Sequence, residues 1–525
     1  SSAASDGYKR QERHSRSFDA DAHHALARRA AGESVVLLKN DDALLPLAEG
    51  TRVAVIGDFA ETPRYQGAGS SAVNSIKVDT FLDCLSDSGL YSVGFAPGFD
   101  RQGKPDAAKQ AEAVALAAKA DAVLLCLGLD EIKESEGLDR ADMKLADNQI
   151  ELLQAVREAN PNTVVIVNAG ASLETPWLAH CKALVYGALG GQAGAGAMVD
   201  VLTGKINPGG KLAETWANAY DDTPARDHFA GPGRTVQYRE GLYVGYRYYQ
   251  TAGVPVAFPF GHGLSYTQFA YSDLHADAHS ATLTVTNTGD RAGAEIVQLY
   301  VAKPNAEIFR PAQELKAFAK VQLAAGESKT VTLTLDDKAF RYRNTRTDSW
   351  EVEGGTYELR VGASSADIRL TAAVEVIGTD ALNPYAGKAL PHYQSGKVQT
   401  VPDAEWETLL DRPIPDDRVK IDRNMTLGEL NHGRSPLGWL VWAVMTVLLN
   451  ASYKKGKPDL NVLFQYNMPL RALAKMTNGA ISMGMVDGIV MEVQGFWVIG
   501  LVRVIFEAVK NVILNAQLEN RLRNS

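Results

Sequence analysis

The hydrophobic pattern of the chain changes period near residue 265, and this change divides the chain into regions that must fold differently. Before this point, short continuous apolar runs alternate with segments of helical periodicity, which is typical of a parallel sheet covered by helices. The apolar runs are residues 53–56, 122–127, 164–167 and 183–186, and the helical segments include 107–120 and 148–160. We therefore predict an α/β domain over residues 21–264, built on an open, mostly parallel sheet.

Beyond residue 265 the period becomes two, which predicts half-buried antiparallel strands. The alternating segments are 281–287, 296–301, 330–335 and 356–361, and Gly, Asp and Asn turns separate them. A small β-sandwich is expected over residues 265–378. The stretch 379–424 contains Pro, Asp and Gly and predicts a wrapping linker. Residues 425–525 return to a helical pattern rich in Met, Trp, Leu and Val, which indicates helices that bury against something.

Charge and cysteine usage exclude several classes of function. The formal net charge is −9 and the basic residues are scattered, so nucleic acid is not an expected partner. The three cysteines form no CxxC pair and no histidine lies at ligand spacing from them. Neither a disulfide framework nor a metal site is indicated, no cofactor is expected, and a reducing compartment fits best.

Targeting signals are weak. The first residues lack the apolar stretch of a signal peptide, so we expect a cytoplasmic, bacterial-type location. The most apolar stretch, residues 437–449, is shorter than the ~20 residues that span a bilayer. It predicts a buried or interfacial helix rather than a transmembrane one.

Two loops at the carboxyl ends of predicted strands are chemically unusual, and ligands of open parallel sheets bind at these ends. The first, residues 65–74, follows the run 53–56 and contains Gly67, Gly69, Ser70, Ser71 and Asn74. Its glycines allow close backbone approach and its neutral hydrogen-bonding groups suit a polyhydroxylated ligand. The alternative is a plain Gly-Ser turn.

The second loop, residues 129–140, follows the run 122–127 and carries a row of carboxylates that ends in Arg140. Crowded carboxylates raise one another's proton affinity, which a general acid requires. We therefore expect a raised proton affinity in this loop. The alternative is a solvated acidic loop without chemistry.

Six stretches, in order along the chain, together resemble glycoside hydrolase family 3, the family of β-glucosidases and their relatives. They are residues 30–40, 67–74, 136–140, 204–212, 240–248 and 258–266. The resemblance implies an N-terminal (β/α)8-like barrel, an α/β sandwich and a fibronectin type III-like domain, with the active site between the first two. Residues 21–264 and 265–378 then correspond to the last two domains, and residues 1–20 to a linker from the barrel.

The resemblance also implies roles for individual residues. Glu136, in a Glu-Gly-x-Asp-Arg pattern, matches the family's catalytic acid/base. Ser70, with Gly69, matches a Gly-x-Gly-Ser loop whose serine binds sugar hydroxyls. Asp139 and Arg140 are interpreted as supports that hold the loop. The barrel's Ser-Asp-Trp nucleophile motif and its Lys-His sugar-binding motif are absent from the chain.

The leading hypothesis is therefore a retaining, exo-acting β-glycosidase, foremost a β-glucosidase, that acts on β-linked glycosides with a nucleophile from the missing barrel. One alternative changes the sugar to that of a β-xylosidase or α-L-arabinosidase. Another is a non-catalytic sugar-binding or assembly subunit. The apolar C-terminal helices favour either a homo-oligomer interface or a cover over the catalytic domains.

Overall fold

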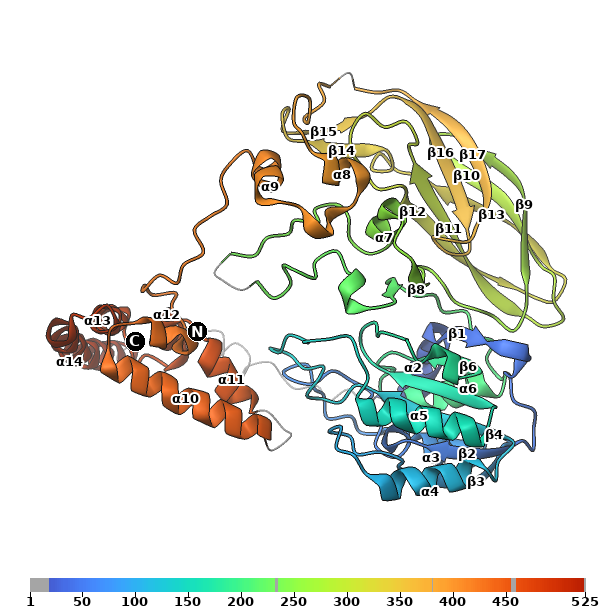
Figure 1. Cartoon of the computed structure of the whole chain (residues 1–525), viewed down its shortest axis with the longest axis horizontal. Coiled ribbons are helices and arrows are strands. Elements are labelled where there is room, and N and C mark those ends of the chain that lie inside the picture. The colour runs from blue at the N-terminus through green and yellow to red at the C-terminus, as the bar shows by residue number, and fades with distance from the viewer. Residues whose placement is uncertain (1–17, 232–234, 380, 455–458, 524–525) are drawn as a thin grey trace.

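The computed structural model describes residues 18–231, 235–379, 381–454 and 459–523, so most of the predicted linker 1–20 lies outside the described residues. Figure 1 shows an α/β domain in blue and green, a β-sandwich in yellow and a helical unit in orange and red. The predicted fold class, an α/β sandwich followed by a fibronectin type III-like β-sandwich and a helical extension, is confirmed.

The α/β domain is built on one six-stranded sheet in the order β1-β6-β5-β4-β2-β3. Its strands are β1 (Val36–Asn40), β2 (Arg52–Ile56), β3 (Tyr91–Ala96), β4 (Ala122–Gly128), β5 (Thr163–Asn168) and β6 (Ala183–Tyr186). All pairs are parallel except β1 with β6. Every residue of β4 is buried, and because successive side chains point to opposite faces, both faces of the sheet are covered.

Two groups of helices cover this sheet: α4 packs beside α5, while α2 and α3 pack against α6. Their bounds are α2 (Ala20–Ser34), α3 (Phe81–Leu85), α4 (Ala107–Ala117), α5 (Asp147–Ala159) and α6 (Gly194–Leu202). Arg28 on α2 makes a two-pronged contact with Asp200 on α6, at 2.7 and 2.9 Å. This paired geometry fixes the angle at which the helices meet.

The β-sandwich consists of a three-stranded sheet, β13-β10-β9, and a four-stranded sheet, β12-β11-β16-β17, with a β14-β15 hairpin. The strands are β9 (Phe269–Ala276), β10 (Ser280–Asn287), β11 (Gly293–Ala302), β12 (Glu314–Leu323), β13 (Ser328–Thr334), β14 (Arg341–Asn344), β15 (Ser349–Val352), β16 (Gly355–Gly362) and β17 (Ile368–Val376). Strand β10 alternates strictly between buried and partly exposed residues, as the period-two pattern predicts.

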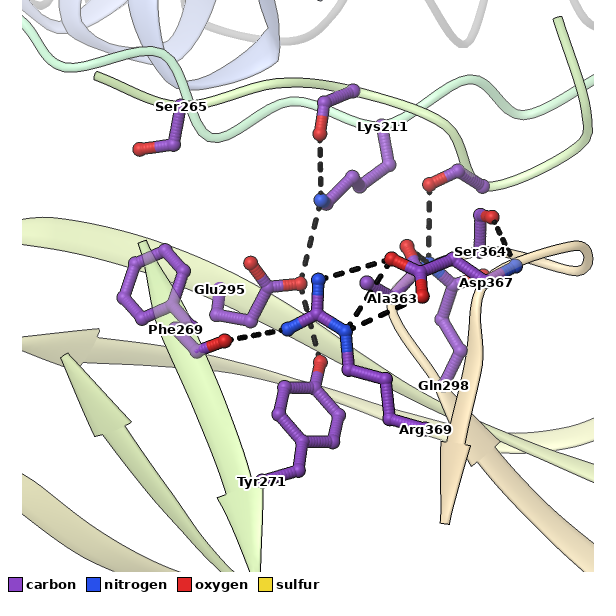
Figure 2. Close-up of polar contacts among 12 residues, drawn as sticks. Lys211, Ser265, Phe269, Tyr271, Glu295, Gln298, Ala363, Ser364, Asp367 and Arg369 are labelled. Atoms are coloured by element: carbon purple, nitrogen blue, oxygen red, sulfur yellow. Dashed lines mark hydrogen bonds and ion pairs between the residues drawn. The ribbon is translucent and has the colours of Figure 1, made fainter. Parts of the chain in front are cut away.

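A buried ion pair joins the two domains (Figure 2). Lys211, from the α/β domain, lies 3.3 Å from a carboxylate oxygen of Glu295 on β11, and both side chains are largely buried. Lys211 also donates to the carbonyl of Gly263, and the Tyr271 hydroxyl donates to Glu295. A buried charge is tolerated only when such partners satisfy it, so the contact fixes how the domains meet.

The stretch predicted as a wrapping linker contains packed structure. Helices α8 (Pro391–Ser395) and α9 (Asp403–Leu410) follow the sandwich, and Tyr393 of α8 shares a small core with Tyr248 and Tyr249 of α7 (Tyr246–Ala252). The buried Arg239 donates to the carbonyl of Val401 and to Asp403. The segment is thus anchored to the α/β domain, where the short strands β7 (Trp216–Ala217) and β8 (Val256–Phe258) also lie.

In the described residues of the C-terminal unit, α-helices α10 to α14 surround a small core. Their bounds are α10 (Pro436–Lys454), α11 (Leu460–Asn467), α12 (Leu470–Met476), α13 (Met483–Val493) and α14 (Trp497–Arg523). Residues 437–449 were expected to form a buried or interfacial helix, and the buried alternative is wrong, because only 11% of the apolar window of α10 is buried. The interfacial alternative stays a prediction. Among the described residues, α10 is also the one helix long and apolar enough to cross a membrane.

The Lys211–Glu295 contact yields a stability prediction. Replacing Lys211 with Met removes the cation that pairs with the buried Glu295, so we expect the free energy of unfolding to fall by about 3 kcal/mol. Urea denaturation followed by fluorescence measures it. Lys329→Met is the control, because Lys329 pairs with Glu327 at the surface and should cost less than about 1 kcal/mol. Equal losses in both variants would contradict the assigned role.

Candidate active site

The two chemically unusual loops meet at one edge of the sheet, as predicted. Strands β2 and β4 are parallel neighbours, so their carboxyl ends lie side by side. Ala68 and Ser135 form an isolated parallel bridge between the loops, and the amide of Glu136 donates to the carbonyl of Ala68 at 3.0 Å. This backbone pairing brings Gly69, Ser70 and Glu136 into one site.

Ser70 binds the carboxylate of Glu136 twice. Its amide donates to Oε2 at 2.5 Å, and its hydroxyl donates to the same oxygen. These two hydrogen bonds hold the pKa of the exposed Glu136 below its ordinary value, because both stabilise the ionised carboxylate. The hydroxyl makes the larger contribution and the amide the smaller one. The expectation that crowded carboxylates raise the proton affinity here is therefore wrong for Glu136.

Arginines bind two of the other carboxylates of the loop, Glu131 and Glu134. The buried guanidinium of Arg64 donates to a carboxylate oxygen of Glu134 and to the Leu129 carbonyl, each at 2.7 Å. Arg101 donates to Glu131 at 3.1 Å and to Asp58 at 2.5 Å. Neither Glu131 nor Glu134 is among the causes of the pKa shift of Glu136, so the crowding that the sequence suggested does not act on this residue.

Sequence reasoning missed both arginines. Each is a single basic residue in a polar loop, and Arg101 comes from the segment after β3, a strand that the apolar pattern does not reveal. Their partners are many residues away in the chain, so no local motif signals the contacts. The position of Arg64 directly before the glycine-rich loop is the one hint that the sequence carries.

Gly69 lets the two loops approach closely. Its φ of +113° lies in a region that side-chain-bearing residues avoid, and a Cβ atom there would lie 2.5 Å from the Cβ of Glu136. The close contact between the loops therefore requires a glycine at position 69. The predicted contact of Gly69 with substrate stays a prediction.

The two residues predicted as loop supports lie differently. Arg140 is half-buried and donates to the carbonyl of Ser172 at 3.3 Å, which links the end of the loop to the segment after β5. Burial lowers its pKa, and Glu134 is the carboxylate that most opposes this. Asp139 is exposed. The supporting roles of both remain predictions.

The site opens into a cavity of about 830 Å³. Gly69, Ser70, Glu136 and Gly137 line one side of it. Helices α11 and α12 line the other, with Leu460, Phe464, Met468 and Met476 among the apolar side chains. Among the described residues of this lining, Glu136 is the only carboxylate.

The comparisons with known proteins agree with this geometry. Residues 35–266 match the glycosyl hydrolase family 3 C-terminal domain, and residues 295–365 match a fibronectin type III-like domain. The chain belongs to glycoside hydrolase family 3. The match covers both of the domains that the sequence assigns to this family.

Several family 3 relatives are similar over the same region. Thermostable beta-glucosidase B of Acetivibrio thermocellus is 44% identical over 69% of this chain and 49% of its own length. Exo-alpha-(1->6)-L-arabinopyranosidase of Bifidobacterium breve is 45% identical over 70% of this chain and 50% of its own. The crystal structure of the Bifidobacterium adolescentis GH3 beta-glucosidase superposes with a TM-score of 0.68 at 43% identity, covering 74% of this chain and 58% of that one.

The chain thus spans about half the length of the curated relatives that it matches. The residues that the structure describes contain no (β/α)8 barrel. In family terms, they supply the α/β sandwich and the fibronectin type III-like domain.

The Ser70–Glu136 contact predicts a titration change. In Ser70→Ala the carboxylate loses the hydroxyl but keeps the amide donor, so the pKa of Glu136 should rise toward its ordinary value without reaching it. Carboxyl ¹³C NMR titration, with Glu136→Gln to assign the resonance, measures this. Ser71→Ala serves as the control. An unchanged pKa in Ser70→Ala would show that the hydroxyl does not bind the carboxylate in solution.

The approach at Gly69 predicts a steric effect that a second glycine can isolate. Gly137 also has a positive φ, of +79°, but nothing lies within 4 Å of a Cβ atom built there. Each Gly→Ala change carries a backbone cost of about 1–3 kcal/mol, and only Gly69→Ala adds a clash with Glu136. Thermal unfolding should therefore show a larger loss for Gly69→Ala. A loss at position 137 that matches it would mean that the clash relaxes freely.

Proposed function

We propose that this chain supplies the acid/base half of a retaining, exo-acting β-glycosidase, foremost a β-glucosidase. The observation that carries the proposal is the placement of Glu136. Two strand-end loops hold its carboxylate at the mouth of a cavity, while arginines bind Glu131 and Glu134. The nucleophile would come from the barrel that family 3 enzymes carry, and a β-linked glycoside would be the substrate.

The lowered pKa of Glu136 bears on the reaction sequence. An acid/base residue must first donate a proton to the leaving group and later take one from water. Ser70 stabilises the ionised form, which suits the second step. A nucleophile carboxylate roughly 5–5.5 Å away would raise the pKa of Glu136 again by like-charge repulsion. The barrel would thus provide the condition for the first step as well as the nucleophile.

The similarity to named relatives supports a glycosidase and leaves two sugar classes. Both β-glucosidases and exo-alpha-(1->6)-L-arabinopyranosidases are similar to this chain at about the same identity. A β-xylosidase or α-L-arabinosidase therefore remains the second candidate. A non-catalytic sugar-binding subunit is less well supported, because it would not need a carboxylate held in this way.

A cytoplasmic, bacterial-type location is part of the proposal. Cys84, Cys126 and Cys181 are free thiols, and burial raises the pKa of Cys126 and of Cys181 to about 12. Unpaired thiols of this kind are typical of proteins in reducing compartments.

The central test compares substrates in a complete enzyme formed from this chain and a family 3 barrel. We expect Glu136→Ala to lower kcat/KM for a disaccharide by about 10²–10⁴-fold, with a smaller loss for an activated aryl glycoside, because a good leaving group needs less protonation. Azide should partly restore turnover of the aryl glycoside. Asp142→Ala, on the same segment and partly exposed, is the matched control.

Two outcomes would contradict the proposal. Equal losses on both substrates without an azide effect would assign Glu136 a structural role. Hydrolysis of an aryl β-glucoside by the isolated chain, abolished in Glu136→Ala, would mean that a carboxylate of this chain acts as the nucleophile.

A further inference from the structure

Two helices of the C-terminal unit, α10 and α14, carry stripes of exposed apolar side chains. On α10 the stripe includes Leu437, Leu440, Val444 and Val447, each about half exposed or more. On α14 a stripe at the same helical spacing runs along residues 498–512, and Val498 is 76% exposed. The described part of the chain places no element over these stripes. Exposed apolar area of this extent marks a binding surface.

The two stripes begin at one corner of the unit. The indole of Trp439 donates to the carbonyl of Gly433 at 2.8 Å, and that of Trp497 donates to the carbonyl of Arg434 at 3.1 Å. Adjacent backbone carbonyls thus accept from both indole N–H groups. Trp439, Trp497 and Phe496 nevertheless each stay about half exposed. We call Leu437, Trp439, Leu440, Phe496, Trp497 and Val498 the aromatic corner. Amphipathic rings of this kind are enriched at membrane–water interfaces.

The inner faces of the helices explain why large side chains point outward. At the α13–α14 contact the backbones meet at Gly488 and Gly500, and a Cβ atom at Gly500 would lie 2.6 Å from the amide of Glu492. Helices that pack in lipid have small residues at their helix–helix contacts and large apolar residues on their outer faces.

The net charge of the C-terminal unit favours one kind of partner for the apolar stripes. Residues 425–525 contain ten Lys and Arg against six Asp and Glu, whereas the whole chain carries −9. Arg434 and Lys454 bracket α10, and no charged residue lies between them. A second copy would bring two units of net positive charge together, which costs electrostatic energy. An anionic lipid surface instead attracts basic residues next to an apolar face.

We propose that the C-terminal helical unit binds the interfacial layer of an anionic phospholipid membrane through the aromatic corner and the adjoining stripes of α10 and α14. The helices lie in the plane of the interface, since Arg503, Glu507 and Lys510 interrupt the apolar part of α14. This surface is separate from the glycosidase proposal, which rests on Glu136. Figure 1 shows the unit apart from the β-sandwich, so such binding leaves that domain free.

The test is vesicle co-sedimentation of the full 525-residue chain. Vesicles of equal parts phosphatidylcholine and phosphatidylglycerol should bind it, vesicles of phosphatidylcholine alone should bind it more weakly, and added salt should weaken binding. The double variant Leu440→Glu/Val498→Glu places two carboxylates in the corner and should lower the partition coefficient more than about tenfold. Ile377→Glu is the matched control, since Ile377 is 94% exposed on the β-sandwich and should bind as the parent does.

Three results would overturn the proposal. The first is a parent chain that stays in the supernatant with anionic vesicles. The second is binding that the double variant leaves intact while circular dichroism shows both proteins folded. The third is a dimer in light scattering that the double variant converts to a monomer without vesicle binding, which would assign the stripes to a second copy of the chain.

Discussion

The candidate site depends on one buried guanidinium. Arg64 stands at the start of the glycine-rich loop and reaches across to the carboxylate-rich loop, where it binds the carbonyls of Leu129 and Glu134 and the Glu134 carboxylate. A single planar group thus fixes the backbone of one loop relative to the other and pairs with the Glu134 carboxylate. Removing it would leave Glu134 without its cation, which is costly for a carboxylate held away from water.

The contact with Ser70 dominates the pKa of Glu136. That contact favours the charged form, so this chain by itself prepares a base rather than an acid. In the proposed enzyme, a second carboxylate brought near by another domain would raise the pKa of Glu136 by like-charge repulsion and so favour its protonated form. Under that proposal, assembly of the domains would set the pKa of Glu136.

Much of this could be predicted from the sequence, and the limits have physical reasons. The strands β2, β4, β5 and β6 are continuous apolar runs because both faces of the sheet are covered, and β10 alternates because one face is solvated. Ser70 and Glu136 lie close together because their loops follow the parallel neighbours β2 and β4 at the same edge of the sheet. Strands β1 and β3 were not predicted, because their mixed polarity resembles that of the adjacent helix and loops.

Contacts between distant residues could not be predicted in the same way. No local motif shows that Ser70 donates twice to Glu136, so the direction of the pKa shift at Glu136 was expected with the wrong sign. Likewise, the apolar pattern of residues 437–449 could not distinguish a buried helix from an interfacial one, and the structure shows that α10 is largely exposed.

The missing side chain at Gly69 has a consequence for evolution. Because a Cβ atom there would occupy the space of the Glu136 side chain, positions 69 and 136 cannot vary independently. A descendant that acquires a side chain at 69 must give up the long carboxylate at 136 or move its loop. The absence of a side chain at position 69 is therefore a condition for keeping a glutamate at position 136 in this loop geometry.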